Sequence, residues 1–273
     1  AKSIFVNVVS FDDGPRRPFF RSNGGERVLG MLRVNMVDIH SHVLPGVDDG
    51  AATLEDSIAM LTMAAEAGTT DIVATSHANT EFLWNAGLIE QRLGEVRQAV
   101  GARIRVHPGC ELHLTFDNVN DAIQHPTKYT INHKQWLLIE FSDLIIFQNS
   151  SEILRKLREA GMSLIIAHPE RNQIMNNRPE MVERWVQEGA FLQLTAQSLL
   201  GTFGSMARKY GEKLIEKGMG HFVATDAHDV SYRVPRLDEV YKWLTDKYGE
   251  ECARKACVDN PLAAITGDEI SPT

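Results

Sequence analysis

The stretch DIHSHVLPGVDDG (residues 38–50) begins as a short apolar run that stops at two histidines. Other apolar runs also end in imidazole or carboxylate groups, in ATSH (74–77), GCE (109–111), LLIE (137–140), IIAH (165–168) and VATDAH (223–228). Side chains at the carboxyl ends of neighbouring parallel strands converge on one mouth. The pattern therefore predicts a parallel-stranded domain with a metal site at that mouth.

Helix-like segments alternate with the apolar runs, which is typical of βα units. Residues 53–68 have apolar side chains at helical spacing, between a Thr53–Asp56 capping pair and a terminating Gly68. The order helix, glycine, strand recurs at Gly161, Gly189 and Gly218. The runs VDIH (37–40), RVHPGCEL (105–112) and WLLIEF (136–141) bring the strands to seven, and 260–268 form a closing helical turn or tail. We therefore expect an α/β fold, a seven-stranded (β/α) barrel.

The length of 273 residues, 43% of them hydrophobic, suits one large barrel better than two small domains. Residues 1–35 have no sustained periodicity and carry turn-forming clusters, so we expect an extension of uncertain structure, with Met36 as the natural start. The barrel is expected to occupy residues 36–273.

The formal charge of −8 argues against a nucleic-acid partner or an anionic membrane surface, and no apolar run approaches a membrane span. The first apolar stretch, residues 4–9, is broken by Asn7 and followed by Asp12-Asp13-Gly14-Pro15, so we expect an unexported, cytoplasmic protein. Three cysteines without metal-finger spacing leave at least one unpaired. A cysteine-nucleophile phosphatase would place arginine six positions downstream. Those positions hold Phe116, Val258 and Ala263, so that mechanism is excluded.

Two pairs of ligand-type residues strengthen the metal prediction. His40 and His42 share one face of a strand because side chains alternate, and Asp226 and His228 repeat the spacing near the other end of the chain. A single histidine is more often a surface or satisfied core residue, so His113 stays ambiguous. Four further histidines fall at strand starts, in loops or beside helix caps and are left out, namely His107, His125, His133 and His221.

The motifs DIHSHVLPGVDDG, ATSH, GCEL, LLIEF, AHPERN and TDAH followed by Arg233, in this order, resemble the polymerase and histidinol phosphatase (PHP) superfamily. Within it, the chain is similar to the bacterial manganese-dependent protein-tyrosine phosphatases of capsule and exopolysaccharide loci. The resemblance covers residues 36–264 and implies a distorted PHP-type barrel.

The resemblance also implies three divalent metal ions. The first would be held by His40, His42, Glu111 and Asp226, the second by Glu111, Glu140 and His168, and the third by Asp49, His77 and His228. Asp48 could replace Asp49, because spacing does not choose between them. Imidazole and carboxylate without thiolate favour manganese, iron or zinc, and only the resemblance prefers manganese. Arg171 and Arg233 match the phosphate-contacting arginines of the family.

The implied reaction is direct hydrolysis of phosphotyrosine by a metal-activated hydroxide, on the tyrosine-rich tail of an autokinase that controls polysaccharide synthesis. The positive charge of three divalent ions and two arginines exceeds the negative charge of four carboxylates, so the pocket would attract an anionic substrate. The alternative is a small-molecule phosphomonoesterase such as histidinol phosphatase. A catalytically silent metal-binding regulator fits the full ligand set poorly, and an amidohydrolase would need a lysine that no middle strand end supplies.

Overall fold

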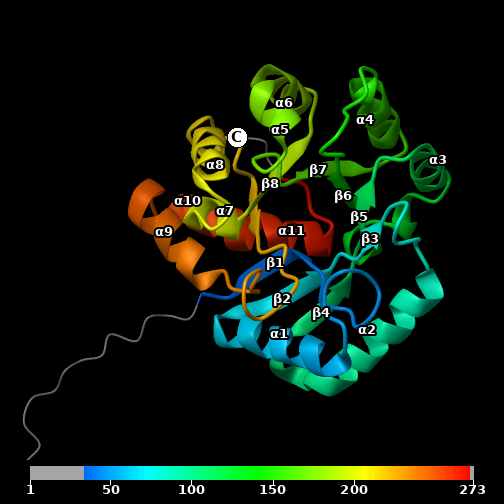
Figure 1. Cartoon of the computed structure of the whole chain (residues 1–273), viewed down its shortest axis with the longest axis vertical. Coiled ribbons are helices and arrows are strands. Elements are labelled where there is room, and N and C mark those ends of the chain that lie inside the picture. Colours follow the sequence, from blue (N-terminus) through cyan, green and yellow to red (C-terminus); the bar gives the residue numbers. More distant parts are fainter. Residues whose placement is uncertain (1–33, 271–273) are drawn as a thin grey trace, which may run out of the picture. The chain divides into compact units, whose positions relative to one another are not determined.

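The computed structural model describes residues 34–270 and contains nine strands there (Figure 1). The expectation for residues 1–35 lies almost wholly outside this range. No helix of the described range is long and apolar enough to cross a membrane. The strands are β1 (Met36–Ser41), β2 (Thr69–Ala74), β3 (His77–Ala78), β4 (Arg105–Pro108), β5 (Glu111–His113), β6 (Trp136–Glu140), β7 (Ser163–Ala167), β8 (Phe191–Thr195) and β9 (Phe222–Ala224).

The strands form two all-parallel sheets, in the orders β1-β2-β4 and β3-β5-β6-β7-β8-β9. The mixed α/β class with parallel strands is thus as predicted, but one closed seven-stranded barrel is not confirmed. The predicted strand 71–77 breaks into β2 and β3, and 105–112 breaks into β4 and β5. Beyond β9, the backbone N–H of Asp226 donates to His40 O at 2.8 Å, and Ser41 and Ala227 form an isolated bridge.

Close packing between distant segments accounts for the break between β4 and β5. A Cβ atom on Gly109 would lie 2.5 Å from Val73 Cγ1, so only glycine lets the two segments approach. Just beyond it, the N–H of Glu111 turns to the carbonyls of Thr75 and Ser76, at 3.3 and 3.2 Å. The chain therefore moves from one sheet to the other between β4 and β5.

Side-chain alternation along the strands builds the core on both faces of the sheets. In β6, Trp136 and Leu138 join an inner cluster with Phe222, whereas Leu137 and Ile139 pack outward against helices. The inner cluster also takes residues from the last helix and lies beneath the strand ends that carry the polar groups.

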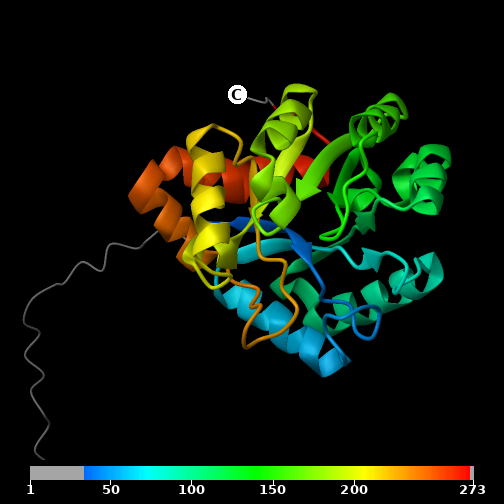
Figure 2. The same ribbon diagram turned by 45° about the horizontal axis from the view of Figure 1, so that its top comes forward.

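The helices cover the outer faces of the sheets, with α1 and α2 over β2 and β4 and with α4 against β7 (Figures 1 and 2). The predicted capping box of Thr53 and Asp56 is present, and the predicted closing helix corresponds to α11. The helices are α1 (Leu54–Glu66), α2 (Ala86–Val100), α3 (Phe116–Gln124), α4 (Ser150–Glu159), α5 (Gln173–Asn177), α6 (Pro179–Gln187), α7 (Ala196–Leu200), α8 (Ser205–Glu216), α9 (Asp238–Tyr248), α10 (Glu250–Arg254) and α11 (Asn260–Thr266).

Candidate metal centre

The polar groups at the strand ends lie together on one face of the molecule. Three groups of ligand atoms each lie within 4.8 Å of one another: His40, His42, Glu111 and Asp226; His42, Asp49, His77 and His228; and His77, Glu111 and Glu140. His168 adjoins them, with Nε2 2.9 Å from Glu111 Oε1. All nine residues predicted from the sequence as metal ligands therefore meet at one site.

The innermost group is fully buried and has unpaired ligand atoms at its centre. His40 Nε2 lies 3.2 Å from Glu111 Oε2 and 3.3 Å from Asp226 Oδ1, and His42 Nε2 lies 3.4 Å from both. Within residues 34–270, neither Glu111 Oε2 nor Asp226 Oδ1 has a hydrogen-bond partner. Leaving buried carboxylate oxygens unpaired is costly unless a cation compensates them, so the observation fits a metal ion.

Hydrogen bonds fix the tautomers of three histidines in the same sense. The Nδ1–H of His40 donates to Gln193 Oε1 (2.8 Å), and that of His42 donates to Asp48 Oδ2 (2.9 Å). The Nδ1–H of His228 donates to Asp226 O (3.0 Å). Each ring therefore turns the lone pair of Nε2 to the cluster, as metal-bound histidines do.

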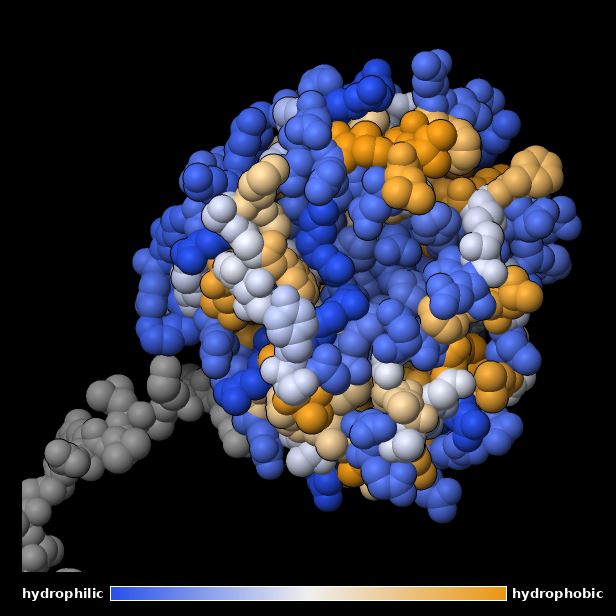
Figure 3. All heavy atoms as spheres, in the orientation of Figure 1, coloured by the Kyte–Doolittle hydropathy of each residue, from blue (hydrophilic) through white to orange (hydrophobic). Residues whose placement is uncertain are grey.

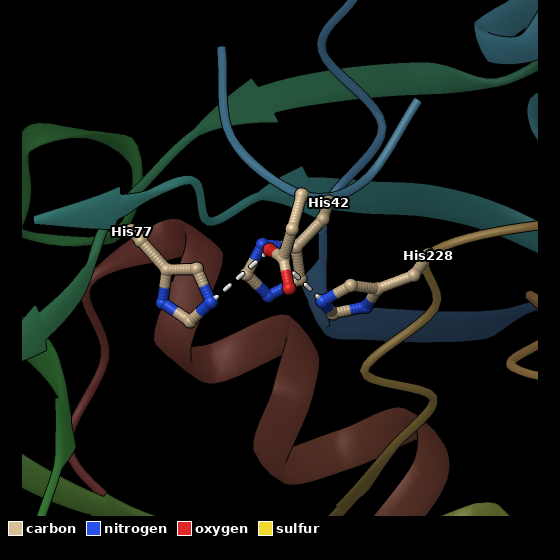
Figure 4. A group of neighbouring side chains, drawn as sticks. His42, His77 and His228 are labelled. Atoms are coloured by element: carbon tan, nitrogen blue, oxygen red, sulfur yellow. Dashed lines mark ion pairs between the residues drawn. The ribbon is translucent and has the colours of Figure 1, made fainter. Parts of the chain in front are cut away.

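The structure separates Asp48 from Asp49. Asp49 Oδ1 lies 3.4 Å from the Nε2 atoms of both His77 and His228, and its side chain is 49% exposed (Figure 4). Asp48 points away from these rings and accepts from His42 Nδ1–H and from the backbone N–H of His77 and Gly50. Asp49 is thus placed to bind a cation, and Asp48 orients His42.

Glu111 faces two groups at once, because Oε2 points to His40 and His42 while Oε1 contacts His168. A carboxylate in this position can bridge two ions. Glu140 lies farther out, 3.9 Å from His168 Nε2. One difference from the expected second set is that His77 groups with these two carboxylates, through Nδ1 at 3.0 Å from Glu111 and 3.8 Å from Glu140.

Electrostatics favour the charged forms of two central carboxylates and of His77, whereas burial lowers the pKa of His228 and favours its neutral form. Burial alone would raise the pKa values of Glu111 and Asp226, but the adjacent histidines lower both well below the usual range. Burial would lower the pKa of His77, yet Asp49 and Glu111 raise it to about 10. These carboxylates are ionised at neutral pH and supply hard oxygen ligands beside imidazole, a donor set that suits manganese, iron or zinc.

Two predicted arginines meet on the far oxygen of Asp226. Arg171 Nη1 and Arg233 Nη2 both donate to Asp226 Oδ2, and their side chains stay 29% and 21% exposed. The guanidinium of Arg171 also lies 4.8 Å from the ring centroid of Phe203. Both cations are therefore held at the edge of the centre and remain accessible to an anion.

Backbone strain coincides with the strand ends. His168 and Asp226 have positive φ angles of 30° and 51°, which non-glycine residues seldom adopt. Such conformations persist where the surrounding structure holds them, and they cluster at functional sites.

In the acidic loop, a Cβ atom on Gly50 would lie 2.0 Å from His42 O, so this close approach requires glycine.

Sequence reasoning missed Gln193 and the orienting role of Asp48. Gln193 is fully buried in the middle of β8, where a polar side chain is unusual, and this was the available signal. His113, which the sequence does not assign, lies outside the three ligand groups, with its Nδ1 3.4 Å from Glu140 Oε2. Cys110 is buried among apolar residues, and burial raises the pKa of its thiol well above the usual value.

A family model described as capsular polysaccharide synthesis, CpsB/CapC, matches residues 36–266. The chain belongs to the CpsB/CapC family. Among its relatives, CapC of Staphylococcus aureus is 33% identical over 241 residues, covering 86% of this chain and 93% of its own. The tyrosine-protein phosphatase YwqE of Bacillus subtilis (strain 168) is 31% identical over 226 residues, covering 79% of this chain and 86% of its own.

A solved structure agrees with this membership. It comes from work on YwqE from Bacillus subtilis and CpsB from Streptococcus pneumoniae, described there as unique metal-dependent tyrosine phosphatases. The TM-score is 0.81 at 29% identity, covering 86% of this chain and 96% of the other. A lactonase from Listeria monocytogenes, with a TM-score of 0.60 at 13% identity, shares the fold alone; it covers 87% of this chain and 96% of its own.

Proposed function

We propose that this CpsB/CapC protein is a metal-dependent protein-tyrosine phosphatase that hydrolyses phosphotyrosine. The observation that carries the proposal is the convergence of the Nε2 atoms of His40 and His42 on two buried carboxylate oxygens that have no hydrogen-bond partner among residues 34–270. Hydrogen bonds fix the tautomers of both rings, and two accessible arginines lie beside them. The relatives named tyrosine-protein phosphatases support the same activity.

The residues fit three divalent ions, for which manganese is our preferred assignment and iron and zinc the alternatives. The first ion would be held by His40, His42, Glu111 and Asp226, the second by Glu111, Glu140 and His168, and the third by Asp49, His77 and His228. His77 also lies close enough to the second set to bind there instead. We further propose that residues 36–273 form one PHP-type unit.

The side chains have distinct tasks in the proposed reaction. Divalent ions, when bound, would supply Lewis acidity and would lower the pKa of water, so that hydroxide is available as the nucleophile near neutral pH. Arg171 and Arg233 would bind the non-bridging phosphoryl oxygens, and their anchoring on Asp226 means that little reorganisation is needed as charge develops. Asp48 and Gln193 hold two imidazoles in the tautomer that ligation requires.

The small-molecule alternative, histidinol phosphatase, is not favoured, because the relatives are named as protein phosphatases. We propose as substrate the phosphotyrosine-bearing tail of a bacterial tyrosine autokinase, consistent with the family's description in capsular polysaccharide synthesis. We also propose a cytoplasmic location, which the three free cysteines support.

The test uses protein stripped of metal with a chelator and then titrated with Mn²⁺. We expect turnover of a phosphotyrosyl peptide to return only with the metal and to exceed turnover of histidinol phosphate steeply. The His40→Ala variant should lose metal and activity while keeping the fold, whereas the exposed-site control His125→Ala should keep all three. Metal-independent turnover, or a preference for histidinol phosphate, would contradict the proposal.

A further inference from the structure

Large apolar side chains are exposed almost only around the mouth. Of nine such side chains in residues 34–270, seven lie in loops that follow strands or in the first turn of the next helix: Leu83, Phe116, Leu144, Ile145, Phe147, Val230 and Tyr232. The eighth, Met206, lies in the first turn of α8, which follows α7. The ninth, Leu262, lies on α11. Figure 3 shows a hydrophilic hollow on this face with apolar side chains at its rim, including a group over α3 and α4. Exposed apolar patches of this kind mark interaction sites.

One part of this rim forms a groove. A cavity of about 610 Å³ lies between α3, α4 and the loop of residues 141–149. Its apolar lining includes Phe116, Val119, Ile123, Ile145, Phe147 and Ile153. Among the residues that the structure describes, the lining contains no carboxylate, although the chain is acidic overall, and its one lysine or arginine is Lys156. Lys156 also pairs with Glu152. An anionic peptide would therefore meet no repelling group in the groove itself.

The groove is continuous with the metal centre. His113 lines the groove, and its Nδ1 lies 3.4 Å from Glu140 Oε2. Phe141 and Ser142, which also line it, directly follow Glu140 at the end of β6. A substrate peptide whose phosphoryl group lies at the metal centre can therefore extend directly into the groove.

We propose that this groove binds the substrate segment beside the phosphotyrosine, and that it selects a large apolar side chain within about three residues of it. This inference rests on the proposed function. An extended chain advances about 3.3 Å per residue, so a neighbouring side chain reaches a groove that begins next to Glu140. Burying that side chain against Ile145 and Phe147 stabilises the complex, whereas a small phosphomonoester leaves the groove unused.

The test compares two phosphotyrosyl peptides on the manganese-loaded protein, one with leucine and one with serine at the positions two and three residues from the phosphotyrosine. We expect kcat/KM to be about tenfold higher for the leucine peptide, which is the effect of partly burying one aliphatic side chain. Ile145→Ser and Phe147→Ser should remove that preference through KM. Both side chains are more than half exposed, so the fold should not depend on them.

Two controls separate this inference from its alternatives. Turnover of p-nitrophenyl phosphate should be the same in both variants as in the wild type, and Leu262→Ser, an equally simple change far from the mouth, should keep the peptide preference. Equal kcat/KM for both peptides in the wild type would overturn the inference. The inference would also be overturned if Ile145→Ser and Phe147→Ser changed only the oligomeric state measured by light scattering. The groove would then be a contact between copies of this chain. Absence of any p-nitrophenyl phosphate turnover with manganese would instead refute the proposed function, and this inference with it.

Discussion

Replacing Asp48 by asparagine tests whether this residue orients His42 rather than binding metal. The carboxylate accepts from three donors: Oδ2 from His42 Nδ1–H and His77 N–H, and Oδ1 from Gly50 N–H. An asparagine has one acceptor oxygen, so if it serves His42 and His77, its NH₂ group must face the N–H of Gly50. One hydrogen bond is lost, and the partly buried N–H of Gly50 is left unpaired.

Such a loss costs about 1–3 kcal/mol of unfolding free energy in the metal-free protein. For a chain of this size it should lower the melting temperature by roughly 2–6 °C. Without the negatively charged carboxylate that accepts from His42 Nδ1–H, the Nε2 atom of His42 becomes less basic. The affinity for the first metal ion should therefore fall about 10- to 100-fold.

The matched control is Asp49→Asn, the same chemical change one residue along. Asp49 is half exposed and accepts from no backbone donor, so its loss should weaken metal binding while leaving the metal-free melting temperature nearly unchanged. Scanning calorimetry of chelator-treated protein and isothermal titration with Mn²⁺ measure both quantities. The reasoning fails if Asp48→Asn changes neither, or if Asp49→Asn destabilises the metal-free protein more.

Three further predictions follow from single contacts. Arg233→Ala should lower kcat/KM for an aryl phosphate about 10- to 100-fold through KM, with metal content unchanged; normal kinetics would show that this residue does not bind phosphate. Gln193→Leu removes the acceptor for His40 Nδ1–H and should weaken Mn²⁺ binding about 10- to 100-fold in titration calorimetry, and unaltered affinity would count against the tautomer argument. His221 Nδ1 accepts from Leu192 N–H, and burial lowers the pKa of His221 to about 4. The unfolded chain takes up this proton near pH 6.5, so stability should decline as the pH falls from about 6.5 to about 4, and His221→Asn, which keeps an acceptor, should remove up to about 3 kcal/mol of that decline in urea melts at several pH values.

The strand ends and helix stops could be predicted because their signals are local. Apolar runs ending at residues such as His40 and His168, and glycines such as Gly161 with a φ of 94°, mark boundaries that neighbouring residues determine. The break between β4 and β5 could not be predicted in this way. It depends on Gly109 packing against Val73, a contact that exists only in the folded chain.

The same distinction applies to the site. Ligand-type residues at strand ends can be read from spacing, but the partner that orients each one comes from a distant segment. His40 and Gln193 are 153 residues apart, and nothing near Gln193 indicates the contact. Asp48 and Asp49 are equivalent in sequence, and only the folded loop turns one toward His42 Nδ1 and the other toward His228.

Anomalous diffraction from crystals soaked in Mn²⁺ tests the central claim most directly, because it locates the ions and identifies their neighbours. We predict three manganese peaks at the mouth, one bound by His40, His42, Glu111 and Asp226, with Glu111 shared between two ions. Peaks at other places, or no peak within ligand distance of Glu111, would contradict the account.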